Sequence, residues 1–201
     1  MKISVILGHP DEKSFNHAIA ETAVETLREN GHDVAFHDLY REKFPAILPA
    51  EEIPRNAALP RIIRRHCAEI AAAEGIIIIH PNWWGQPPAM LKGWVDRVLR
   101  PGVAYTFTEG DSLGAGVLIG LLKANAVLVF NTSNTPPERE ASVFGDPLEL
   151  IWKNNMFVSC GARSYYRKTF GVIITSTLEQ REKWLREVKE ITSRHFPATP
   201  A

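Results

Sequence analysis

Continuous apolar runs alternate along the chain with segments in which apolar residues recur at helical spacing. The runs predict five buried strands, at Lys2–Leu7, Asp33–His37, Gly75–His80, Ala126–Asn131 and Lys168–Ile174. The segments between and after them predict helices at Asn16–Asn30, Pro60–Ala73, Pro88–Leu99, Pro147–Val158 and Leu178–His195. This alternation predicts an α/β fold whose parallel sheet is covered by helices on both faces.

Turn and cap residues support these boundaries. Asn30-Gly31 is expected to end the first helix, and Pro87-Pro88 to begin the third. The prolines between Leu39 and Pro60 indicate a surface excursion. Because no repeat or linker divides the chain, we expect one domain over residues 1–196 and a frayed tail at residues 197–201.

Five strands in this alternation fit the doubly wound order 2-1-3-4-5. In such sheets ligands bind beyond the carboxyl ends of the strands, where the winding direction reverses. The rule selects the loops after the first, third and fourth strands, which are Gly8–Asn16, Pro81–Pro87 and Thr132–Pro137.

Composition narrows the class of ligand. Lys plus Arg and Asp plus Glu both number 23, so nothing in the charge balance favours a nucleic acid or an anionic membrane. No apolar stretch approaches the ~20 residues of a bilayer span, and no signal-peptide pattern is found. Cys67 and Cys160 lack metal-ligand spacing and are expected to be reduced packing thiols. We therefore expect a cytoplasmic protein with a small ligand and no membrane insertion.

The first loop has the chemistry of an anion site. It leads into a helix, whose N-terminal amides attract negative charge. Ser14 and Asn16 can add hydrogen bonds, and His9 or Lys13 can add positive charge, so a phosphate group is the natural guest. The loop has neither Walker A nor GxGxxG spacing. Ser14 or Asn16 can equally serve as a plain helix N-cap, and the loop alone leaves both roles open.

Two adjacent tryptophans stand in the loop after the third strand. Trp83 and Trp84 offer stacking surface to a flat ring, and Gly85 allows close backbone approach. Amides beside Gly85 can donate to the edge of an isoalloxazine, where proteins tune flavin chemistry. Taken alone, the tryptophans are equally compatible with core or interface positions.

Three motifs occur in chain order, and together they resemble one family. They are His9-Pro10-x-x-x-Ser14-Phe15-Asn16, then the ungapped stretch His80-Pro81-Asn82-Trp83-Trp84-Gly85-x-Pro87-Pro88-Ala89-x-Leu91-Lys92-Gly93-Trp94-Val95-Asp96-Arg97-Val98, then Gly102-Val103-Ala104-Tyr105. This pattern resembles the NAD(P)H:quinone oxidoreductase family of flavodoxin-like flavoproteins. The resemblance covers about residues 1–195 and is most specific in the middle stretch.

The resemblance implies a flavin site and a reaction. It implies that four residues of the first loop contact the flavin phosphates and the attached nucleotide, namely His9, Ser14, Phe15 and Asn16. It also implies that five residues bind the isoalloxazine, namely Pro81, Asn82, Trp83, Trp84 and Gly85. Tyr105 would line the acceptor pocket across the interface of a homodimer. FAD is the expected cofactor and FMN the alternative. NAD(P)H is the expected hydride donor, and a quinone-like molecule is expected to accept the electrons in a ping-pong mechanism.

The chain departs from this family after the fourth strand. The quinone reductases carry a Thr-Thr-Gly-Gly run there, followed by a Tyr and a His that manage charge. This chain has Asn131-Thr132-Ser133-Asn134-Thr135-Pro136-Pro137, Phe144 at the His position, and no Tyr between 106 and 164. The Thr-x-Asn-x-Pro form is closer to bacterial members resembling the modulator-of-drug-activity type. Thr132, Ser133 and Asn134 are expected at the flavin edge, and Asn134 and Tyr105 are the candidate catalytic residues.

The same residues bear on alternative functions and on metal binding. A flavin-binding ancillary subunit of a potassium-efflux system is the main alternative, whereas zero net charge and the tryptophan pair disfavour a flavodoxin electron carrier. No acidic cluster suits a phosphoacceptor response regulator. Without HxH or HxxxH spacing, no metal site is expected. The histidines other than His9 are expected in ordinary positions, with His17 exposed on the first helix.

Overall fold

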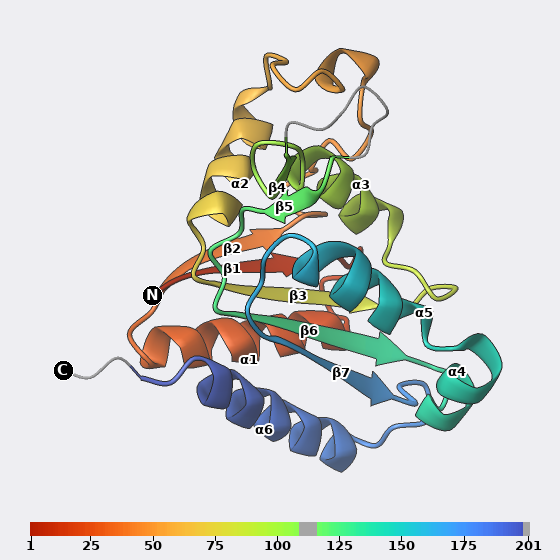
Figure 1. Cartoon of the computed structure of the whole chain (residues 1–201). Helices are drawn as coiled ribbons and strands as arrows, with labels where there is room; N and C mark the ends of the chain where they lie inside the picture. The colour runs from red at the N-terminus through yellow and green to blue at the C-terminus, as the bar shows by residue number, and fades with distance from the viewer. Residues whose placement is uncertain (109–115, 199–201) are drawn as a thin grey trace.

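A five-stranded parallel sheet forms the centre of the molecule in the computed structural model, which describes residues 1–108 and 116–198 (Figure 1). Its order is β2-β1-β3-β6-β7, the predicted doubly wound order with β6 and β7 as the fourth and fifth core strands. The strands are β1 Lys2–Leu7, β2 Asp33–Asp38, β3 Gly75–Pro81, β6 Ala126–Ser133 and β7 Tyr165–Gly171. The expected fold class is confirmed.

Burial explains which strand boundaries the sequence predicts well. Every residue of β3 and of β6 is buried, so these central strands appear in the sequence as continuous apolar runs. The edge strand β7 is only half-buried over most of its length. It begins and ends three residues before the predicted Lys168–Ile174, because an edge strand carries no continuous apolar signal.

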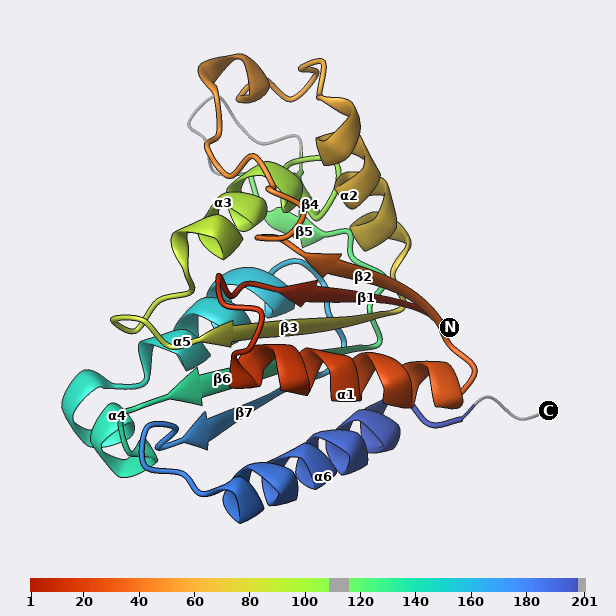
Figure 2. The same ribbon diagram turned by 180° about the vertical axis from the view of Figure 1, so that it is seen from behind.

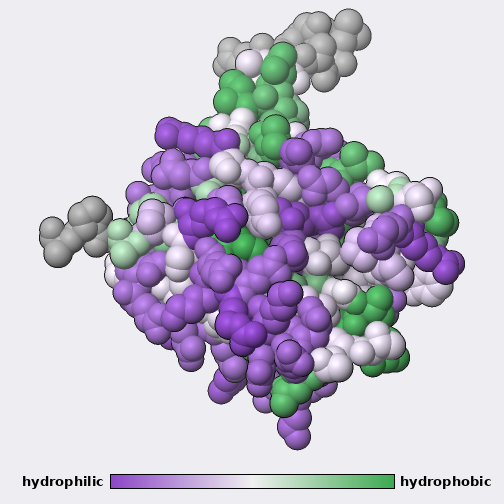
Figure 3. Space-filling view, turned by 90° about the horizontal axis from the view of Figure 1, so that it is seen from below, coloured by the Kyte–Doolittle hydropathy of each residue, from purple (hydrophilic) through white to green (hydrophobic). Residues whose placement is uncertain are grey.

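Helices cover both faces of the sheet (Figures 1 and 2). On one face α1 Phe15–Glu29 lies beside α6 Leu178–His195, and they pack on Ile77 and Ile79 of β3. On the other face α2 Arg61–Ala72, α3 Ala89–Val98 and the π-helix η2 Leu150–Val158 pack on Ile76 and Ile78. The outer side of the α1 and α6 layer is mostly hydrophilic (Figure 3).

Short elements lie where the sequence predicted loops or a longer helix. They are η1 Ala50–Glu52, the antiparallel pair β4 Tyr105–Phe107 and β5 Leu118–Gly120, and α4 Pro137–Phe144. The predicted helix Pro147–Val158 consists of the short α5 Pro147–Glu149 followed by η2. None of the residues of α4 is buried, so this helix leaves no apolar stripe in the sequence.

The proline-rich excursion between Leu39 and Pro60 is anchored to α3. The Arg97 guanidinium donates to Glu52 Oε2 at 2.9 Å and also to the Pro45 carbonyl. Arg100 donates to the carbonyls of Glu52 and Pro54 at 2.8 and 3.0 Å. Arg97, Arg100 and Glu52 are all buried, so this segment is pinned to the body of the protein.

Three further expectations concern the cysteines, membrane-spanning helices and the C-terminal tail. Cys67 and Cys160 are both buried and free, as expected, and burial raises the pKa of each thiol to about 11. Among the described helices, none combines the length and the apolar character that a bilayer crossing requires. Most of the predicted frayed tail, residues 199–201, lies outside the described residues.

Candidate active site

The loops after β1, β3 and β6 meet at one edge of the sheet. These strands are neighbours and run parallel, and Pro81 of β3 pairs with Thr132 of β6. The loops line a pocket of about 400 Å³, called here the first chamber. It brings together most of the residues predicted to bind the cofactor, which are His9, Ser14, Phe15, Asn16, Pro81, Asn82, Trp83, Thr132, Ser133 and Asn134.

One end of the first chamber is suited to an anion. It lies at the start of α1, where the first amides of a helix have no partner within the helix. Lys13 and Arg181 also line it, and Arg181 of α6 was not predicted from the sequence. Arg181 is held in place because its Nε donates to Ser176 Oγ at 2.8 Å and its Nη2 to the Ile173 carbonyl at 3.2 Å.

Three residues of the first loop have more specific positions than the sequence indicated. Ser14 is the N-cap of α1, its Oγ accepting from the His17 amide at 3.4 Å, and it also lines the chamber. The Phe15 ring packs against Trp184 and Phe170, so Phe15 offers the chamber its backbone amide. Asn16 is 2% exposed, and its Nδ2 donates to Thr132 Oγ1 at 2.9 Å. Asn16 Oδ1 is buried without a partner among the described residues.

The expectation that His17 is an exposed helix position is wrong. Its side chain is buried between the first loop and the end of β2, where Nε2 lies 3.0 Å from Asp38 Oδ2. Its Nδ1 lies 2.9 Å from Ser14 Oγ. No pattern in the sequence indicates this pair, because Asp38 reaches His17 only through the pairing of β1 with β2.

Two hydrogen bonds fix the conformation of the loop Pro81–Gly85, one within the loop and one to β6. The Asn82 amide donates to the Thr132 carbonyl at 2.7 Å, and Asn82 Oδ1 accepts from the Gly85 amide at 2.9 Å. Trp84 and Gly85 both have positive φ, 57° and 69°. Trp83 is 43% exposed and Trp84 is fully exposed, so neither tryptophan is a core residue of this chain.

A second chamber of about 480 Å³ adjoins the first. Asn82 and Thr135 line both chambers, and the second is completed by Trp84, Gly85, Glu140, Phe144 and Pro147. Phe144, which stands at the family's His position, therefore lines this chamber. The two chambers together form an elongated site with a cationic end at α1 and an aromatic end at Trp84.

A buried histidine fixes the base of the tryptophan loop. His80 is fully buried, its Nδ1 lies 2.8 Å from the Pro81 carbonyl, and its Nε2 accepts from Trp152 Nε1 at 2.9 Å. Burial lowers the pKa of His80 to about 4, so the ring is neutral at pH 7. Asn131 Nδ2 lies 2.7 Å from the same Nε2, and Asn131 Oδ1 accepts from Arg167. From the sequence, His80 was expected to have only an ordinary strand-end role.

The loop after β6 is also ordered by local contacts. Ser133 Oγ accepts from the Thr135 amide at 3.0 Å, and Asn134 Oδ1 accepts from the Ile174 amide at 2.9 Å. Asn134 is exposed and lines the first chamber. Its Oδ1 is thereby turned toward the β7 loop, which leaves the Nδ2 group as the part of the amide that can donate to a ligand.

The structure does not bring Tyr105 to either chamber of the same chain. It lies on β4 beside Phe107, with ring centroids 5.6 Å apart, and lines a separate hollow with Leu118 and Cys160. The predicted role of Tyr105 depends on a second subunit.

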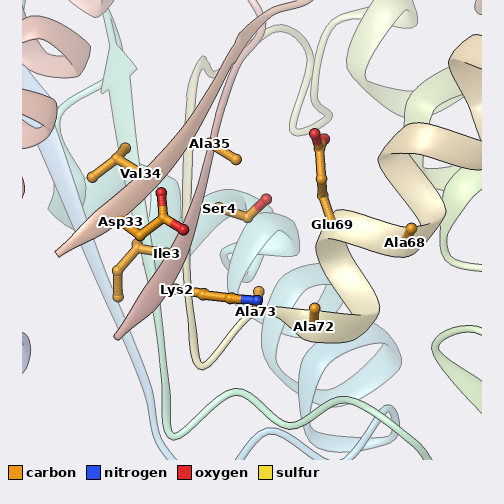
Figure 4. Close-up of a pocket in the computed structure, with 10 residues that line it drawn as sticks. All are labelled: Lys2, Ile3, Ser4, Asp33, Val34, Ala35, Ala68, Glu69, Ala72 and Ala73. Atoms are coloured by element: carbon orange, nitrogen blue, oxygen red, sulfur yellow. The ribbon is translucent and has the colours of Figure 1, made fainter.

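A hollow of about 410 Å³ lies away from the chambers, between α2 and the first halves of β1 and β2. It is lined by small and apolar residues with Lys2, Asp33 and Glu69 (Figure 4). It does not involve the loops after β1, β3 and β6, and the Glu69 carboxylate is engaged by His37 at 2.6 Å. The two chambers, rather than this hollow, therefore form the candidate ligand site.

A cluster of His37, Glu42 and His66 was missed by the spacing argument. Their ligand-type atoms all lie within 4.8 Å of one another. Burial opposes charge on these side chains, but hydrogen bonds from the two histidines outweigh it and lower the pKa of Glu42 to about 2. Trp94 Nε1 donates to His66 Nδ1 at 3.1 Å, which leaves the proton of a neutral ring on Nε2, facing Glu42. Both histidines thus face the Glu42 carboxylate, and the cluster ties β2 to α2.

Comparisons with known proteins show the family to which the chain belongs. A family model described as flavodoxin-like fold matches residues 1–190. An uncharacterized NAD(P)H oxidoreductase of Haemophilus influenzae is 36% identical over 174 residues, which covers 84% of this chain and 83% of that protein. The ribosyldihydronicotinamide dehydrogenase [quinone] of Rattus norvegicus is 29% identical and covers 94% and 91%.

A solved structure shows the same fold. It is an FMN-dependent NADH-azoreductase from Bacillus anthracis in complex with FMN, which superposes with a TM-score of 0.75 at 18% identity. The alignment covers 98% of this chain and 100% of that one.

Proposed function

This chain belongs to the flavodoxin-like fold family and is an NAD(P)H oxidoreductase of the quinone-reductase type, and we propose that it works through one flavin held across the two chambers. The observation that carries the proposal is the convergence of the three loops on one elongated site. A bound flavin accepts two electrons from a nicotinamide and passes them to a second substrate. The residues that line the two chambers would bind and orient that group.

The donor set fits a phosphorylated flavin. The first amides of α1, the Lys13 ammonium and the Arg181 guanidinium gather at the anion end, where a phosphate needs donors and positive charge. At the other end, the exposed Trp83 and Trp84 and the backbone around Gly85 offer a face and an edge for a planar ring. The unpartnered Asn16 Oδ1 is consistent with a site completed by a ligand.

FAD is proposed over FMN because a separate hollow is lined by residues adjacent in sequence to Ile173 and Arg181 of the first chamber. This hollow has a volume of about 370 Å³, and the residues that line it include Thr175, Gln180 and Trp184. It offers room for a nucleotide beyond a diphosphate, which FMN lacks. The azoreductase neighbour is FMN-dependent, and FMN is the alternative for this chain.

The second chamber is proposed to receive the hydride donor and the acceptor in turn. It is aromatic at Trp84 and Phe144 and has a volume of about 480 Å³. Since the quinone-reductase Tyr and His have no counterparts, charge at the ring edge would be stabilised by loop amides and by Thr132, Ser133 and Asn134. Proton delivery would fall to water or to the substrate.

The deciding experiment is the absorbance spectrum of the purified protein together with mass analysis of the released cofactor. We expect flavin bands and an FAD mass, NAD(P)H oxidation that depends on a quinone, and parallel double-reciprocal lines when both substrates are varied. A colourless protein whose tryptophan fluorescence does not respond to added FAD or FMN would refute the flavin site. Bound flavin without NAD(P)H oxidation would favour the ancillary-subunit alternative, which the enzyme names of the relatives do not favour.

A homodimer is proposed to complete the acceptor pocket. Large apolar side chains are exposed around β4 and β5, including Phe107 at 51% and Ile119 at 44%, and Trp84 is exposed completely. A second copy covering this region would bury them and bring Tyr105 to the partner's second chamber. Sedimentation at micromolar concentration should show a dimer, and a fully active monomer would contradict this arrangement.

A further inference from the structure

A buried chain of hydrogen bonds leads from the anion end of the first chamber to a carboxylate. Ser14 Oγ lies 2.9 Å from His17 Nδ1, and His17 Nε2 lies 3.0 Å from Asp38 Oδ2. His17 and Asp38 are 9% and 8% exposed, whereas Ser14 is partly exposed and lines the chamber. One hydroxyl therefore connects the ligand site to a buried histidine–aspartate pair.

The partners of this chain determine where its protons lie. Asp38 Oδ1 accepts from the amides of Tyr40 and Arg41, both at 3.2 Å, which suits an ionised carboxylate. A carboxylate at Oδ2 requires a proton on His17 Nε2, and a neutral ring then has a bare Nδ1. With the ring neutral, the Ser14 hydroxyl points its proton at that nitrogen and offers the chamber only lone pairs, which repel a phosphate oxygen.

We propose that His17 is a positioning residue that takes up a proton when a flavin phosphate binds beside Ser14. This inference rests on the proposed flavin site. The proton comes from solvent and adds to Nδ1, which then donates to Ser14 Oγ. Ser14 keeps its own proton and turns it toward a phosphate oxygen. The transfer breaks an O–H bond of the solvent donor and forms the N–H bond at Nδ1, and Asp38 balances the new charge.

Other groups around the chamber do not provide the same response. The His9 ring lies 6.3 Å from that of His17, centroid to centroid. Burial lowers the pKa of His9 despite its backbone hydrogen bond with Asp11, and a charge on His17 lowers it further. Asp11, Lys13 and Arg181 also line the chamber, and none of them belongs to the hydrogen-bonded chain Ser14–His17–Asp38. The unpartnered Asn16 Oδ1 is a second, independent sign that a ligand completes this end of the site.

Calorimetric titration of apoprotein tests the inference. FAD is titrated in buffers of different ionisation enthalpy between pH 6 and 9, because its diphosphate does not change protonation there and any uptake belongs to the protein. We expect uptake approaching one proton per FAD, with affinity falling by up to tenfold per pH unit where uptake is complete. Riboflavin, which has no phosphate, should bind without proton uptake.

Two variants and one spectroscopic measurement identify the group. His17→Gln cannot be charged but can still donate to Asp38, so it should abolish the uptake and weaken FAD while leaving riboflavin affinity unchanged. His9→Gln should retain the uptake. If His17→Gln does not fold, the ring ¹⁵N shifts of His17 in the wild-type protein should change from a neutral to a doubly protonated pattern when FAD is added.

Each remaining outcome overturns a defined statement. FAD binding without proton uptake, equal uptake in wild type and His17→Gln, or unchanged ring ¹⁵N shifts would refute the role of His17 and leave the flavin site intact. Protein that binds neither FAD nor riboflavin would refute the proposed function, and with it this inference.

Discussion

Replacing Gly85 by Ala tests whether the tryptophan loop must have its observed shape. Gly85 has φ +69°, and a Cβ built on it would lie 2.6 Å from Pro147 Cγ. Gly145 is the matched control, because its φ is +70° and a Cβ there would meet nothing within 4 Å. Both substitutions incur the left-handed penalty of about 1–2 kcal/mol, partly offset by about 0.4–1 kcal/mol of lost freedom in the unfolded chain.

The contact with Pro147 separates the two variants. Relieving it by moving the proline ring or the loop costs about 1–3 kcal/mol, as overpacking does. For a chain of 201 residues, about 2–4 °C of melting temperature corresponds to 1 kcal/mol. With a net backbone cost of about 1 kcal/mol at both positions, Gly145→Ala should melt about 2–4 °C below wild type. Gly85→Ala should melt about 4–16 °C below it, and only this variant should bind flavin more weakly. Equal melting temperatures together with equal flavin affinities in the two variants would show that Pro147 does not constrain this loop.

Further changes probe the histidine base, the ring edge and the exposed tryptophan. Because the pKa of His80 is about 4 in the folded protein, below the ordinary 6.5, the unfolded chain binds more protons between these values. The free energy of unfolding should thus fall by up to about 3 kcal/mol as pH drops from 6.5 to 4, and urea unfolding of His80→Gln should lack that part of the decrease. Asn134→Ala should slow flavin reduction by NAD(P)H about 10²-fold in stopped-flow traces while flavin content stays constant, and an unchanged rate would exclude Asn134 from catalysis. Trp84→Ala should change the free energy of unfolding by no more than about 0.5 kcal/mol because the side chain is fully exposed, yet lower kcat/KM for quinones, with Trp84→Phe recovering activity.

The sheet could be predicted because its central strands carry the strongest signal available in a sequence. β3 and β6 are buried on both faces, so their apolar runs define their limits to within two residues. The edge strand β7 is half-buried and was predicted three residues too late. Helix α4 contributes no buried residue, and no periodicity could have revealed it.

The candidate site divides along the same line. Residues in the three loops were predictable because strand order alone brings those loops together, and the family motif named the side chains. The groups that support these residues could not be predicted, because each contacts a residue of a different helix or strand that is distant in the sequence. His17 meets Asp38 of β2, His80 meets Trp152 of η2, and Arg181 reaches the first chamber from α6. A polar residue on a helix is exposed by default, and only the fold supplies the partner that makes burial favourable.

The distribution of charge along the site bears on how it can work without the quinone-reductase pair. Lys13, Arg181 and the acidic Asp11 line the first chamber, whereas Glu140 is the one charged side chain among the residues that line the second. His80 below the tryptophan loop is neutral at pH 7 and aims its bound proton at the Pro81 carbonyl. In the proposed flavin site, Lys13 and Arg181 would hold a phosphate, at a distance from the place where hydride would be exchanged. Negative charge that develops at the ring edge would have to be stabilised by fixed dipoles, such as the backbone amides near Gly85 and the side chain of Asn134. These groups need no change of protonation during turnover.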